Sequence, residues 1–148
     1  MAVTYTNNWK NILDKLRNVL RTEFKGALPV YIGDEGSEGT QFLRLEPIGT
    51  ELIEYSITSE IREFNINVFY YFAEHNVKKT ALDHVLRYVS RIEALIHDNT
   101  TMTYTNENSA SETAYNCRME TSELLPDDES GVYIAQWEWK CLHRGNLS

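Results

Sequence analysis

Apolar residues recur at two different spacings along this chain, and the spacing predicts which segments are helices and which are strands. Between residues 7 and 26, and again between 76 and 99, apolar side chains return every three or four positions, as on one face of a helix. Along residues 61–73, 114–124 and 131–144 they alternate with polar ones, as in strands with one buried face. Shorter strands are predicted at 30–32 and 41–46.

Both predicted helices are amphipathic and have signals at their ends. Asn7 or Asn8 is placed to cap the first helix, and Gly26 follows its end. Asn76 is placed to cap the second. Each helix must lie on an apolar surface, and the second is expected to cover the strand at 61–73. The apolar stripe of the second helix consists of Val77, Ala81, Leu82, Val85, Leu86, Val89, Ile92, Leu95 and Ile96.

The resulting order is α-β-β-β-α-β-β. Runs of strands separated by single helices predict an α+β fold with a mostly antiparallel sheet and two helices packed on it. With 148 residues, the chain is expected to form a single domain, 1–148. Residues 102–105 are a further candidate strand. Residues 50–59 either extend the second strand after a bulge or form a strand of their own, and the polar segment 106–113 is predicted to be a mobile loop.

The predicted strand at 61–73 has apolar side chains on both faces at one end. One face begins polar with Glu63, Asn65 and Asn67 and then becomes aromatic at Phe69 and Tyr71. A strand with one solvated face should stay polar on that face. Phe69 and Tyr71 therefore predict a second cover, which either the first helix or a neighbouring subunit supplies. The other face consists of Phe64, Ile66, Val68, Tyr70 and Phe72.

Two pairs of residues in the last third of the chain leave alternatives open. Trp137 and Trp139 share one face of a predicted strand, where they either belong to the core or form a partner interface. Cys117 and Cys141 are expected to lie opposite each other across a hairpin, on its apolar face. They are then either buried free thiols or a disulfide, and a cytosolic origin favours free thiols.

Composition narrows the function classes. The formal net charge is −8, which disfavours binding to nucleic-acid phosphates. No run of 18 apolar residues predicts a membrane span, and the first residues lack the pattern of a signal peptide, so the protein is expected to be made in a cytosol. The segment 33–39 has three glycines and the acids Asp34, Glu35 and Glu38. It predicts a solvated acidic loop that faces a partner or a channel.

No pattern of residues predicts catalysis. The four histidines lack the spacing of a zinc site and are expected to be solvated or at helix ends. The glycines of 33–39 match neither a dinucleotide site nor a phosphate-binding loop. No catalytic residue, metal or cofactor is therefore predicted. A small ligand-binding domain or enzyme of the α+β class remains the alternative of another kind, and it would require a pocket with converging polar groups.

The order of the segments resembles phage tail terminator proteins, also called tail completion or neck proteins. The resemblance is carried by the opening helix WKNILDKLRNVLRTEF, the strand segment PVYIGDE, the pair QFLRLEPIG and EIREFNINVFYYF, the helix KKTALDHVLRYVSRIEALI and the Trp-rich strand VYIAQWEWKCL. It covers nearly the whole chain and is a likeness of pattern. The segments 49–59 and 106–113 match no pattern of the family.

The resemblance implies a structural virion protein without catalysis. Members of the family form hexameric rings that cap the tail tube, dock onto the head–tail connector and let DNA pass through the centre. The implied partners are further copies of the chain, the tail tube protein and the connector or adaptor protein. The implied location is the tail or neck of the virion, assembled in the host cytoplasm. A head-closure or connector adaptor of the phage neck is the alternative within the same class.

Overall fold

The computed structural model describes residues 5–33, 41–73, 81–127 and 132–146 of the chain. Its fold is α+β, as predicted, and the predicted order is confirmed with one additional strand. That strand, residues 102–105, was already a candidate in the sequence. The helices are α1 (Asn8–Phe24) and α2 (Ala81–Asp98), and the strands are β1 (Val30–Ile32), β2 (Gln41–Tyr55), β3 (Ser59–Ala73), β4 (Met102–Thr105), β5 (Ser111–Asp127) and β6 (Val132–Asn146).

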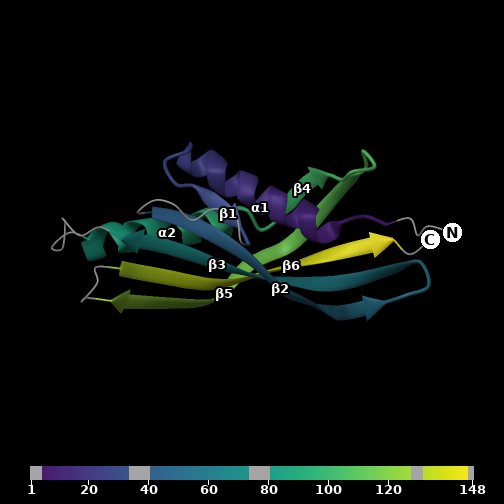
Figure 1. The fold of residues 1–148 in the computed structure, drawn as a ribbon. Coiled ribbons are helices and arrows are strands. Elements are labelled where there is room, and N and C mark those ends of the chain that lie inside the picture. The colour runs from purple at the N-terminus through teal and green to yellow at the C-terminus, as the bar shows by residue number, and fades with distance from the viewer. Residues whose placement is uncertain (1–4, 34–40, 74–80, 128–131, 147–148) are drawn as a thin grey trace.

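The strands form one sheet in the order β1-β2-β3-β6-β5-β4. The pair β1–β2 is parallel and the other neighbouring pairs are antiparallel, which confirms the mostly antiparallel sheet. The pair β3–β6 lies at the centre and stays in register without interruption, from Ser59 opposite Asn146 to Ala73 opposite Val132. The long strands cross one another with a marked twist (Figure 1).

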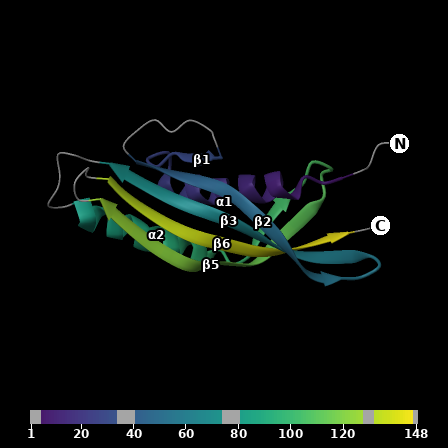
Figure 2. The same cartoon turned by 60° about the horizontal axis from the view of Figure 1, so that its bottom comes forward.

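Both helices lie on the same face of the sheet (Figures 1 and 2). On this face the helices bury Leu16, Leu20 and Ile92 completely. Beneath them, Trp137 and Trp139 of β6 are also fully buried. The predicted alternation of β3 is confirmed on this face, because its five even-numbered apolar residues from 64 to 72 are all buried. The opposite, outer face of the sheet carries no helix in the described part of the chain.

The first helix begins and ends as the sequence predicts. Asn7 is the N-cap, and its side-chain oxygen accepts a hydrogen bond from the backbone N–H of Lys10 at 3.1 Å. Lys25 follows the last helical residue in the left-handed conformation, with φ 50°, and Gly26 also has a positive φ. After these residues the chain leads to β1. The caps therefore determine where α1 begins and ends.

The predicted stripe of α2 is wrong at Leu82 and Leu86, which are each 44% exposed. The stripe is confirmed at Val85, Ile92 and Ile96, which are buried against the sheet. Tyr88 takes part in that contact by stacking on Tyr70, with ring centroids 5.7 Å apart. Tyr88 thus contributes to the buried side of the helix, which leaves Leu82 and Leu86 toward solvent. Asn76 and Val77 lie outside the described residues.

The loop predicted at 106–113 is confirmed only for residues 106–110, because residues 111–113 belong to a strand. Residues 106–110 form a tight turn, in which the Asn106 side chain accepts hydrogen bonds from the backbone N–H groups of Asn108 and Ala110. From Ser111 onward the segment belongs to β5. The Glu107 carboxylate also accepts a hydrogen bond from the backbone N–H of Asn7 at 3.2 Å, so this turn fastens the start of α1.

Candidate interaction surface

Six residues gather on the outer face of the sheet, and we call them the outer aromatic surface. Strand register places Arg44 between Tyr31 and Phe69 in one row. It places Tyr71 between Phe42 and Ile134 in the next row. Both predicted interface residues of β3 are thus on the face that α1 and α2 leave open (Figure 2). The alternative in which the first helix covers Phe69 and Tyr71 is therefore wrong.

The aromatic rings of this surface pack on one another. Tyr71 stacks on Phe42 with a centroid distance of 4.7 Å and an interplanar angle of 21°. Tyr31 meets Phe42 edge to face at 5.7 Å. The Arg44 guanidinium lies 5.9 and 5.5 Å from the Tyr31 and Phe42 centroids, and it donates a hydrogen bond to the Gly33 carbonyl. These contacts hold the rings in place before any partner arrives.

The rings are only partly covered by these contacts. Phe42 is buried, but Phe69, Tyr71 and Ile134 are half-buried. Aromatic residues beside an arginine are the composition that protein interfaces favour. The outer aromatic surface is therefore a candidate site for a protein partner.

Farther along the same face, the sheet is covered by an ion-pair network. Arg118 contacts Glu63 at 2.7 Å and Glu120 at 2.9 Å, and Lys140 contacts Glu120 at 2.9 Å. The hydrogen bond from Lys140, followed by that from Arg118, lowers the pKa of the Glu120 carboxyl below its ordinary value. This part of the outer face satisfies its own charges, which distinguishes it from the aromatic rows.

The end of the β2–β3 hairpin, residues 47–60, extends past both helices, and we call it the arm (Figure 1). Its turn is closed by Ser56, whose hydroxyl accepts from the backbone N–H of Ser59 at 3.1 Å. The arm holds most of the large apolar side chains that are strongly exposed in the described chain. These are Ile48 (57%), Leu52 (46%), Ile53 (50%), Tyr55 (68%) and Ile57 (94%).

The other predicted site residues are not at this surface. Trp137 and Trp139 are fully buried beneath the helices, so they belong to the core, which was one of the two alternatives, and offer nothing to a partner. The acidic residues Asp34, Glu35 and Glu38 lie outside the described residues.

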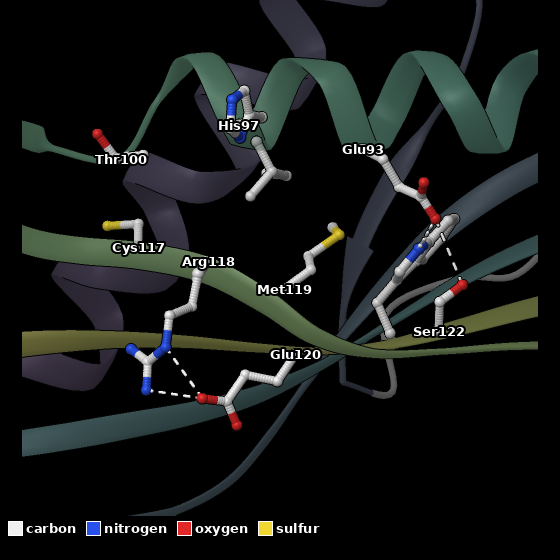
Figure 3. Close-up of a pocket in the computed structure, with 10 residues that line it drawn as sticks. Glu93, His97, Thr100, Cys117, Arg118, Met119, Glu120 and Ser122 are labelled. Carbon is white, nitrogen blue, oxygen red and sulfur yellow. Dashed lines mark hydrogen bonds and ion pairs between the residues drawn. The ribbon is translucent and has the colours of Figure 1, made fainter.

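A cavity of about 340 Å³ lies between α2 and β5. Figure 3 shows Glu93 and His97 on the helix, with Cys117 and Met119 of β5 pointing toward it. The Glu93 carboxylate already accepts hydrogen bonds from Trp137 Nε1 at 2.9 Å and Ser122 Oγ at 3.3 Å. Glu93, Ser122 and Trp137 are thus bonded to one another at the wall of this cavity.

Cys117 and Cys141 are both buried and free. A bulge in β5 between Tyr115 and Arg118, where Asn116 has φ 51°, turns Cys117 toward Cys141. The predicted alternation of this strand is therefore wrong at Tyr115, which lies on the opposite face of the sheet from Cys117. The hydrogen bond between the two thiols, together with burial, raises the pKa of the Cys141 thiol and leaves it protonated.

Two of the four histidines, His84 and His143, are more deeply placed than predicted, and His75 lies outside the described residues. His143 is buried, with Nε2 3.3 Å from a Glu112 carboxylate oxygen, and His84 packs between Phe72 and Tyr88. His97 is exposed near the end of α2, as expected. Among the residues that the structure describes, no group of histidine, cysteine and acidic side chains is arranged to hold a metal ion. No helix there is long and apolar enough to cross a membrane.

Comparison with protein-family models and with curated proteins finds no match for this chain. The assignment of a site therefore depends on the geometry alone. That geometry includes the arm, which the sequence did not single out. A signal was present, because Leu52 and Ile53 are adjacent and must point to opposite faces, while no predicted helix remained to cover either of them.

Proposed function

We propose that this protein is a structural component of a phage tail that acts as a tail terminator, forming a ring that caps the tail tube. The observation that carries the proposal is the outer aromatic surface, which neither helix of the described residues covers (Figure 2) and on which Phe69, Tyr71 and Ile134 stay half-buried. In a closed ring each copy supplies the cover for the next. The resemblance of the segment order to tail terminators supports the same proposal and suggests a hexamer.

The role of such a ring is mechanical. One of its faces fits the last ring of the tail tube and stops further growth, and the other fits the head–tail connector. DNA passes through the centre during ejection. A net charge of −8 suits this role, because an acidic channel repels phosphates and does not retain a passing genome.

The test is to add the purified, labelled protein to tail tubes that have no heads and to locate the label by electron microscopy. A terminator should bind one end of each tube and stop its elongation. Binding to DNA-filled heads without tails, and not to tubes, would instead identify the head-closure adaptor. Absence of binding to both particles would overturn the proposal.

A further inference from the structure

Within the described residues, the apolar side chains of the arm are left largely uncovered. β1 pairs with β2 only at Leu43, Arg44 and Leu45, so β2 is an edge strand from residue 47 onward in the described sheet. Only the base of the arm lies near a helix, the start of α1, and the tip projects past it (Figure 1). Clustered exposed apolar residues of this size mark an interaction site in soluble proteins. We therefore expect a partner to cover the apolar residues of the arm.

The backbone of the arm is unsuited to pairing with another strand. Pro47 has no N–H to donate. Two register shifts in the β2–β3 pair place bulges at Ile48 and Ile53, and bulges twist an edge away from a straight partner. The partner must therefore contact the arm through its side chains, which requires an apolar surface and not a free strand edge.

The charge of the arm indicates which kind of apolar surface can bind it. The arm has no lysine or arginine, and its acidic residues are Glu51, Glu54 and Glu60. Among the described residues, only Glu60 of these three forms an ion pair, with Arg62 at 3.1 Å just outside the arm. Glu51 and Glu54 of two arms brought together would therefore repel each other. The outer aromatic surface contains no carboxylate and includes Arg44. It is also the largest group of half-buried aromatic rings on the outer face of the described sheet. Its charge and its composition both complement the arm.

The two surfaces lie at opposite ends of one sheet. Along β3 the arm ends near Glu60, the ion-pair network begins at Glu63, and the outer aromatic surface begins at Phe69. An arm therefore cannot reach the aromatic surface of its own chain, but it can reach that of another copy. Contacts between two different surfaces of identical chains propagate head to tail, and they close into a ring when the rotation between successive copies closes.

We propose that the arm of one copy packs on the outer aromatic surface of the next copy. This inference rests on the proposed function in so far as both require self-association. It adds the identity of the two surfaces and makes the contact heterologous. Tyr55 and Ile57 at the tip, the most exposed apolar residues of the arm, are its anchors.

Cross-linking tests the pairing directly. Ile57→Cys and Gln136→Cys are introduced together, because Gln136 lies beside Phe69 in the strand register. A short bismaleimide should then link one copy to the next and give a ladder of covalent oligomers. Each single variant should give none, and neither should the wild type, whose two cysteines are buried. Linkage by Ile57→Cys alone would show arm-to-arm pairing and overturn the proposal.

A second pair of variants tests the energetic contribution. Tyr55→Ser with Ile57→Ser removes the apolar tip and should weaken association at least about tenfold, as expected for loss of an interface anchor. Leu82→Ser with Leu86→Ser is the matched control, because it removes two exposed apolar side chains from α2 and should leave association unchanged. Circular dichroism checks that both variants are folded.

The outcomes separate the two proposals. An assembled wild type whose association is unaffected by the tip variant would overturn the role of the arm and leave the ring intact. A wild type that stays monomeric at every concentration, and gives no ladder in the double cysteine variant, would overturn the ring as well.

Discussion

Replacing Phe69 and Tyr71 together by aspartate tests whether these residues serve the monomer or its assembly. Both are half-buried on the outer face, away from the helices. The double variant should therefore fold and lose the ability to associate. The same type of substitution on the core face of the same strand, Ile66→Asp, should abolish folding, because Ile66 is fully buried.

The magnitudes follow from the burial of each ring. Fully burying a large apolar side chain is worth about 1.5–3 kcal/mol, so a half-buried ring contributes about 1 kcal/mol. The stack of Tyr71 on Phe42 adds about 0.5–1.5 kcal/mol. The double variant thus loses about 3 kcal/mol, less than the roughly 5–15 kcal/mol of a typical domain. Within an interface, each buried and unpaired carboxylate would cost several kcal/mol more.

Chemical denaturation and sedimentation velocity measure the two effects separately. We expect a cooperative unfolding transition shifted to lower denaturant, together with a monomer at concentrations where the wild type is assembled. If the double variant fails to fold, Phe69 and Tyr71 belong to the monomer core. If it folds and associates like the wild type, the interface lies elsewhere. Either result would refute the reasoning.

Three further changes test individual contacts. Trp137→Phe should lower the free energy of unfolding by about 1–3 kcal/mol, because it leaves a buried space and removes the hydrogen bond to Glu93; urea denaturation measures the loss. Lys25→Gly should raise the free energy of unfolding by about 0.5–1 kcal/mol, because glycine adopts the left-handed conformation without strain. An unchanged midpoint of urea denaturation would contradict this. Glu120→Gln should lower the melting temperature at pH 7, and its difference from the wild type should shrink as the pH falls below 4.5. The pKa of Glu120 is lowered in the folded state, so its contribution is present above the ordinary value of 4.5 and disappears as the carboxylate is protonated in acid.

Periodicity predicted most of the fold because the core is built from regular elements. The alternation of β6 from Tyr133 to Cys141 and the helical spacing of α1 translate directly into buried faces. The prediction from periodicity failed where a single residue changes which face of the sheet the following side chains occupy. Asn116 in the left-handed conformation shifts β5 by one position, and nothing in the alternating pattern marks such a bulge.

The candidate site was only half predictable. Phe69 and Tyr71 stood out because aromatic residues occupied a face that should have been polar. The arm did not stand out, because its exposure depends on where the helices end in space, and Leu52 or Tyr55 would look the same in a covered strand. The sequence also could not decide the role of Trp137 and Trp139, which are buried in the core. An alternating strand pattern is the same whether the apolar face packs against a helix or against a partner.

The central claim is that this chain assembles with copies of itself through the outer face of its sheet. Its mass in solution, measured by light scattering and sedimentation equilibrium over a wide range of concentration, tests that claim most directly. The account predicts a closed oligomer that withstands dilution and dissociates in the Phe69→Asp, Tyr71→Asp variant. A mass of one chain, 17.2 kDa, at every concentration, would contradict it.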